Sequence, residues 1–187
     1  MSNKVIRRLK LAIEKIDQIN EICKTKGISE ALEDELLTKP AIMKHFDVIH
    51  QQFKKIEEEG NKEEALKGLK EKDLKGIRDI RNFSSHDYDN INKNIVKDAI
   101  EKELPSLKED LQKIVKEKEK TICKDLEKKI DYLNKKQNIL ISQAKRDLVN
   151  SIKKQYAELQ KNGIDLDKSY VEKFKKISKD NLIERSR

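Results

Sequence analysis

Apolar residues recur at steps of three and four through the first part of the chain, which is the spacing of one face of an α-helix. The series consists of Val5, Leu9, Ile13, Ile16, Ile19 and Ile22. It predicts a first helix over about residues 3–24, ended by the glycine of the KTKGIS segment. A short helix is expected to follow from Ser29 to Leu37.

The pattern then predicts a long helix that begins near Thr38, with Thr38 as its cap and Pro40 in its first turn, where a missing N–H is harmless. Its inward-facing residues are Ile42, Phe46, Ile49 and Phe53. The next helix is expected to begin at Asp73 as its cap and to bury Leu74, Ile77 and Ile80.

A turn rich in Asp and Asn follows, with Asn92 as a plausible cap for a helix over 95–104. Pro105 is then expected to bend or restart the chain. After about Ile114 the apolar residues thin to a single stripe with a mean step of about 3.7. The stripe predicts one long helix or a pair folded at NKKQN, followed by a short last helix capped by Asp165 or Asp167.

Composition supports an all-α class. Apolar residues make up only 35% of the 187 residues, charged residues make up 42%, and there are 5 Gly and 2 Pro. This mixture is typical of long, solvent-exposed helices. The length favours one domain, or one domain with an extension, over two full cores.

The net charge of +8 is unevenly distributed along the chain. Residues 1–110 hold 22 Lys and Arg against 23 Asp and Glu, whereas residues 111–187 hold 21 against 12. A positive field in the C-terminal part would attract RNA or an acidic protein partner.

Several classes of function find no support in the sequence. There is no apolar run of signal-peptide or membrane-span length, and Cys23 and Cys123 are far apart, so we expect a reduced, cytoplasmic chain without membrane contact. The glycines form no phosphate-binding loop. His45 and His50 would lie about 140° apart on one helix, so no metal or other cofactor is expected.

The stretch R-N-F-S-S-H-D-Y, residues 81–88, carries the side chains most suited to chemistry. Arg81 has a planar cation that suits phosphate, and His86 can act as acid and base near neutral pH, which is what RNA cleavage requires. Asn82 adds a neutral donor, and Tyr88 adds a hydroxyl. Residues 84–87 are no catalytic triad, since neighbours on one backbone point apart. From their spacing alone, these residues could equally be ordinary polar residues on the surface or at the end of a helix.

This stretch resembles the R-x4-6-H motif of the HEPN superfamily, in the R-N-x3-H-x-Y form of HepT-like toxins. Further segments that are similar to the family are KPAIMKHFDVIHQQFKKI, GIRDIRN and INKNIVKDAIEKELPSLKEDL. The resemblance covers about residues 1–115 in the right order. It divides the chain into a HEPN (HepT-like) domain over 1–115 and a basic helical extension over 116–187.

The resemblance implies a helical bundle that forms a homodimer in which two motifs face one cleft. It implies a metal-independent endoribonuclease in which Arg81 holds phosphate, His86 is the general acid and base, and Asn82 orients the substrate. Tyr88 matches the tyrosine that an MNT-type nucleotidyltransferase antitoxin modifies.

The leading hypothesis is therefore a ribonuclease toxin of a toxin–antitoxin or phage-defence module that cleaves cellular RNA. The alternative is a non-catalytic HEPN module that binds RNA or protein through its basic tail. A purely structural helical protein is the third interpretation.

Overall fold

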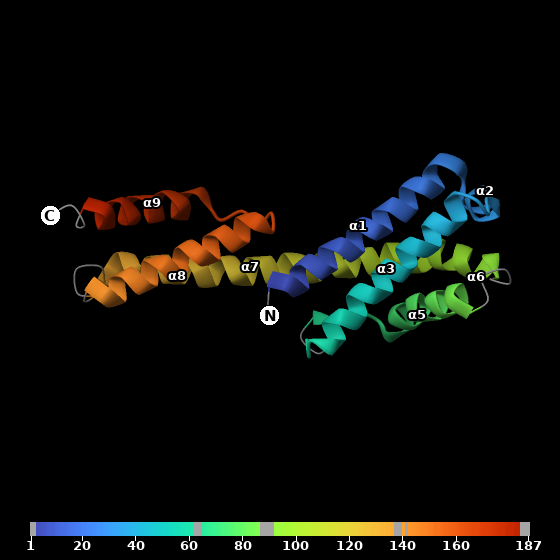
Figure 1. Cartoon of the computed structure of the whole chain (residues 1–187), viewed down its shortest axis with the longest axis horizontal. Coiled ribbons are helices and arrows are strands. Elements are labelled where there is room, and N and C mark those ends of the chain that lie inside the picture. Colours follow the sequence, from blue (N-terminus) through green and yellow to red (C-terminus); the bar gives the residue numbers. More distant parts are fainter. Residues whose placement is uncertain (1–2, 62–64, 87–91, 137–139, 141, 184–187) are drawn as a thin grey trace. The chain divides into compact units, whose positions relative to one another are not determined.

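The computed structural model describes residues 3–61, 65–86, 92–136, 140 and 142–183, with the side chains in these ranges except those of residues 3, 83–86 and 177–183. Throughout these ranges the secondary structure is helical and contains no strand (Figure 1). The all-α prediction is thus confirmed. The chain divides into two compact units, Met1–Lys116 and Glu117–Arg187.

The first unit is a helical bundle whose central element is the long helix α3 (Thr38–Glu58). Its elements are α1 (Asn3–Lys26), α2 (Ile28–Glu33), α3 (Thr38–Glu58), α5 (Glu71–His86), α6 (Lys93–Asp98), the π-turn η2 (Ala99–Glu103) and the first part of α7 (Leu104–Lys136). Helix α3 packs against both α1 and α5 (Figure 1). The ion pair of Lys108 with Asp17 joins α7 to α1.

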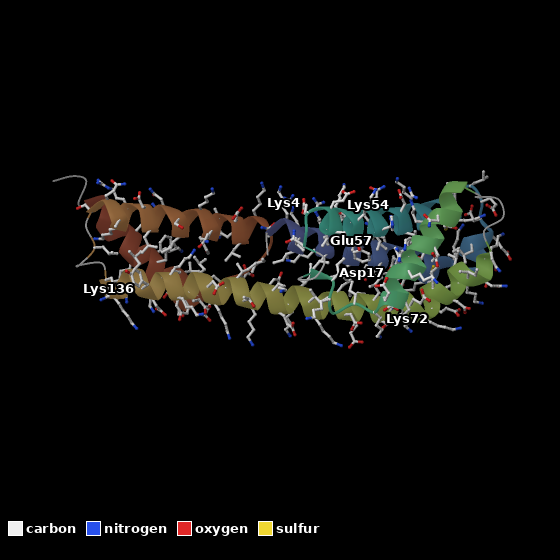
Figure 2. All side chains as sticks on the ribbon, turned by 90° about the horizontal axis from the view of Figure 1, so that it is seen from below. Lys4, Asp17, Lys54, Glu57, Lys72 and Lys136 are labelled. Carbon is white, nitrogen blue, oxygen red and sulfur yellow. The ribbon has the colours of Figure 1, made fainter. Side chains whose placement is uncertain are left out.

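The core of this unit follows the apolar pattern closely. Its largest fully buried side chains are Ile6, Leu9, Ile16, Ile19, Ile42, Phe46, Ile49, Ile56, Ile77, Ile80, Leu104 and Leu107. Burying each such side chain contributes roughly 1.5–3 kcal/mol. Charged side chains cover the outside of the helices (Figure 2).

The turn between α2 and α3 differs from the prediction, since α2 ends at Glu33 and not at Leu37. Asp34 ends the helix because its Oδ1 accepts the N–H groups of Leu36 and Leu37 at 3.2 and 3.0 Å. The hydrogen bond from Lys26 and those two N–H groups lower the pKa of Asp34 to about 2. Gly27, by contrast, ends α1 as expected, with a φ of 83° that suits glycine.

Two predicted caps were wrong. Thr38 is the first residue of α3, and its hydroxyl donates to the carbonyl of Ala31 at 2.7 Å instead of capping its own helix. Asp73 lies inside the first turn of α5, which begins at Glu71, and its side chain is buried. Pro40 does lie in the first turn of α3, where its missing N–H has no cost.

Between α6 and Pro105, the π-turn η2 connects α6 to the start of α7. Asn92 caps α6 as predicted, because its Oδ1 accepts the N–H of Asn94 at 3.0 Å. The N–H of Leu104 then bonds the carbonyl of Ala99, five residues back, which makes η2 a π-turn. Pro105, which has no N–H to donate, follows directly in the first turn of α7.

The second unit contains the rest of α7, α8 (Ser142–Lys161) and α9 (Lys168–Ile183). Of the two arrangements predicted, the pair of helices is the one observed, and Gln137 lies outside the described residues. Lys129 of α7 donates to Gln155 of α8 at 2.9 Å, and Lys173 of α9 pairs with Asp131 at 2.6 Å. The buried apolar residues among those described are Leu126, Ile130, Leu133, Val149, Ile152, Leu159, Ile164, Leu166 and Phe174.

Asp167 is the cap of α9, because its Oδ1 accepts the N–H of Ser169 at 2.8 Å. None of the helices searched within the described ranges is long and apolar enough to cross a membrane.

Candidate active site

The motif residues lie at the C-terminal end of α5. Ile77 and Ile80 fix this helix by entering the core, which leaves Arg81 half-buried and Asn82 exposed. The Nη1 of Arg81 donates to the Oδ1 of Asn82 at 3.3 Å. Asn82 is therefore placed to orient the guanidinium of Arg81 while its own amide nitrogen stays available to a ligand.

His50 faces this part of α5 from the neighbouring helix α3. Its ring is half-buried, and its Nδ1 is shielded from solvent without a hydrogen-bond partner among the described residues. Because an unpaired N–H would be costly there, the favoured neutral form carries its proton on Nε2. His50 can then donate a hydrogen bond from Nε2.

The electrostatics of the site keep His50 neutral. Burial lowers the pKa of His50, and the positive charges of Arg81 and, more weakly, Arg78 lower it further, against the opposing effect of Asp47. His50 thus lies close enough to both guanidinium groups to feel their charge. The pKa of His45 is also lowered, first by burial and then by the charge of Lys15. Since Lys15 belongs to α1, His45 faces α1 and not α5. His50, rather than His45, therefore lies on the side of α3 that faces the motif helix.

Arg78 is a residue of this site that the sequence argument did not single out. It is exposed, three residues before Arg81, so that both arginines share one face of α5. Its Nη2 lies 3.8 Å from a carboxylate oxygen of Glu71, and it borders a small cavity of about 50 Å³ together with His50 and Leu74. The signal was present in the RDIR spacing of residues 78–81, which places two arginines one turn apart.

His86 is the last residue of α5, and its side chain is not among those described. His86 follows Arg81 by five positions, a spacing that corresponds to about 140° around the axis of a regular helix. Within one chain the two predicted catalytic positions therefore lie on different faces of α5. Tyr88 lies outside the described residues.

In chemical terms, the site offers two guanidinium groups, a neutral amide and a neutral imidazole. Guanidinium forks bind phosphate oxygens and can balance the charge of a phosphorane. Over the parts of the chain that the structure describes, no three His, Cys, Asp or Glu side chains gather as metal ligands would.

The described part of the chain defines an all-α helical bundle with an Arg-Asn pair near the end of one helix, and comparison with known proteins gives the family. A family model described as "Ribonuclease HepT-like" matches residues 12–114, which is more than half of the chain. The chain belongs to the HepT-like ribonuclease family of the HEPN superfamily. No curated protein and no solved structure gives a match.

Proposed function

We propose that this protein is a metal-independent endoribonuclease. The observation that carries the proposal is the grouping of Arg81, Asn82 and Arg78 with a neutral His50 on the motif side of α5, in a member of a ribonuclease family. Permanent cations and neutral donors beside a histidine suit cleavage of a phosphodiester by its own 2′-hydroxyl.

Each residue has a distinct role in the proposal. Arg81 holds the scissile phosphate and stabilises the charge that develops on it, and Asn82 orients Arg81 and the substrate. His86 transfers the protons as general acid and base. His50, kept neutral by burial and by Arg81, donates a hydrogen bond without competing for the phosphate as a second cation.

The protein is proposed to act as a homodimer. Since Arg81 and His86 start about 140° apart on α5, a second copy that faces the first would bring the Arg81 of one chain toward the His86 of the other. A site that combines residues from both chains removes the geometric difficulty of one regular helix.

The biological setting proposed is a toxin of a toxin–antitoxin or phage-defence module in the cytoplasm. An MNT-type nucleotidyltransferase antitoxin would then silence the toxin by modifying Tyr88. The catalytic part would be the domain over residues 1–115, and the extension over 116–187 would assist it.

Separate substitutions of Arg81→Ala and His86→Ala test the activity. Each should lower the rate of RNA cleavage by at least about 10²-fold, because each removes a group that acts in the transition state. Cleavage of a fluorescent RNA in the presence of EDTA is the measurement, with circular dichroism and sedimentation to verify fold and mass.

His45→Ala is the matched control, because His45 is a half-buried histidine of the same bundle that faces Lys15 on α1. It should leave the cleavage rate within about twofold of the parent. Cleavage that survives both motif substitutions would sink the proposal, as would activity that is lost with EDTA and restored by a metal ion.

One observation favours a second function, namely RNA binding without catalysis. The exposed face of α8 carries Arg146, Lys153, Lys154 and Lys161, which lie within an arc of about 100° around the helix axis. A basic stripe of this kind supplies salt-sensitive affinity for a polyanion. Under this alternative, changes to α8 would remove function and His86→Ala would not.

A further inference from the structure

A groove between the first turns of α1 and the second half of α3 has no role in the proposed cleavage. It has a volume of about 440 Å³, and its lining includes Lys4, Arg7, Arg8, Leu11 and Gln52. This volume lies in the range of small-molecule sites. Figure 2 shows Lys4 projecting from α1.

The groove is strongly positive although residues 1–110 have almost no net charge. Four of its lining side chains are Lys or Arg, and the one carboxylate, Glu14, already pairs with Lys15 at 3.0 Å. Arg8 is held by Glu59 at 2.7 Å, so its guanidinium is positioned. Arg7 is exposed and has no ion-pair partner among the described residues. The groove thus contains one cation that an ion pair holds in place, Arg8, and a neighbouring cation that a ligand could bind, Arg7.

Gln52 supplies a second, independent sign of a ligand. The residue is only 7% exposed, which is rare for glutamine, and it makes no hydrogen bond to the described residues. Its amide is not among the side-chain groups that are both shielded from solvent and unpaired, so the part of Gln52 that stays accessible lines the groove. A molecule bound there would exchange hydrogen bonds with this amide in place of water.

The groove is separate from the candidate active site. Gln52 follows His50 by two residues on α3, so the two side chains point about 160° apart around the helix axis. His50 faces α5, and Gln52 faces α1. A ligand in the groove would therefore not occupy the place of the scissile phosphate in the same chain.

We propose that the groove between α1 and α3 binds a nucleoside phosphate, with Arg7 and Lys4 on the phosphate and the amide of Gln52 on the base. Guanidinium and ammonium groups bind phosphate oxygens through charge-assisted hydrogen bonds. A glutamine amide places a donor and an acceptor next to each other, which matches the edge of adenine. The proposal rests on the proposed function in one respect: the nucleotide is one unit of the RNA strand that reaches the active site.

Binding of a 2′-O-methyl oligonucleotide of eight adenosines to the full chain tests the proposal. This probe has no 2′-hydroxyl and cannot be cleaved, so binding is measured apart from catalysis. Arg7→Gln should weaken binding about tenfold, the usual effect of losing a hydrogen bond to a charged group. Lys24→Gln is the charge-matched control, because Lys24 is exposed on the same helix outside the groove.

A second pair of variants tests the base contact. Gln52→Met keeps the length of the side chain and removes the amide, and it should weaken binding roughly fivefold. Gln51→Met changes the neighbouring, exposed glutamine, which donates to Asp47 at 2.9 Å, and should change binding less than twofold.

The same titrations with AMP identify the source of the phosphate. If AMP binds and responds to Arg7→Gln as the oligonucleotide does, the groove holds a free nucleotide, and if only the oligonucleotide does, it holds an RNA strand. Equal effects of Arg7→Gln and Lys24→Gln would overturn the site, because the loss would then be one of net charge. Equal effects of Gln52→Met and Gln51→Met would overturn the contact to the base.

These outcomes are independent of cleavage. The titrations can be repeated in the Arg81→Ala chain, where the groove is intact. If the parent binds the oligonucleotide in the groove but does not cleave RNA, the proposed function is refuted and the binding site stands. If the parent cleaves RNA but does not bind in the groove, the binding site is refuted and the proposed function stands.

Discussion

At the scale of single residues, two carboxylates lie close together near the start of α5, those of Asp73 and Glu103. The side chain of Asp73 is 1% exposed, and neither of its carboxylate oxygens has a hydrogen-bond partner among the described residues. The carboxylate of Glu103, on the π-turn, occupies the space that a Cβ at position 76 would need, so that Gly76 allows the close approach. Burial, and then the charge of Asp73, raise the pKa of Glu103.

Glu103→Gln should therefore stabilise the protein at neutral pH, by roughly 1 kcal/mol, the scale of relieving a poorly compensated buried polar group. Because the folded-state pKa of Glu103 lies above its unfolded value of 4.5, the parent loses stability as pH rises from 4.5 through the folded pKa. The gain from Glu103→Gln should grow over the same interval and vanish below it.

Urea unfolding of both chains between pH 4 and pH 7 measures this difference. Glu101→Gln is a suitable control, since Glu101 is exposed on the same turn. A parent and a Glu103→Gln variant with parallel pH profiles would contradict the interpretation of the pair.

At the scale of elements, the cap by Asn92 fixes where α6 begins. Asn92→Ala should cost about 1 kcal/mol of unfolding free energy, because the N–H of Asn94 loses its acceptor at the helix start. Thermal unfolding measures the loss. Asn94→Ala, which keeps the cap, should change stability by less than half as much, and equal losses would show that Asn92 does not act as a cap.

The helices themselves could be predicted from the sequence because each has a clear apolar face. Ile42, Phe46 and Ile49 are all buried as their spacing requires. The errors concern polar residues with more than one possible partner: Thr38 bonds a carbonyl of α2, and Asp73 faces η2. Ala31 lies seven residues before Thr38, and Glu103 lies on a different element from Asp73, so both partners are outside the two or three residues that local cap rules consider.

The candidate site was predictable only in part. Arg81 and Asn82 were identified from the motif, and the structure places them in contact. Arg78 and His50 join them because α3 and α5 pack together, which is a tertiary fact that no spacing within one segment contains. The roles of His86 and Tyr88 stay predictions.

At the scale of the whole molecule, the basic stripe of α8 should act on RNA affinity rather than on chemistry. Replacing Arg146, Lys153 and Lys154 together by Gln should weaken binding of single-stranded RNA and reduce the slope of log K against log salt by up to about 2, since each phosphate contact contributes roughly 0.7. The rate of cleavage at saturating RNA should stay within about twofold of the parent.

Filter binding at several salt concentrations, with single-turnover cleavage alongside, makes the measurement. Lys116, Lys120 and Lys124 form a control set of three exposed lysines on α7. Equal changes in slope for both sets would show that RNA responds to total charge and not to the α8 surface. Loss of cleavage at saturating RNA would show that the α8 surface acts in the chemical step as well as in RNA affinity.

The π-turn η2 has a consequence for how the length of this chain can vary. A π-turn holds one residue more than the α-helical turn in its place, so deleting one residue from 99–103 would join α6 and α7 into a regular α-helix. The residues before the deletion would then turn by about 100° around the helix axis, and Val96 would leave the core. In this segment the number of residues is under stronger constraint than their identity.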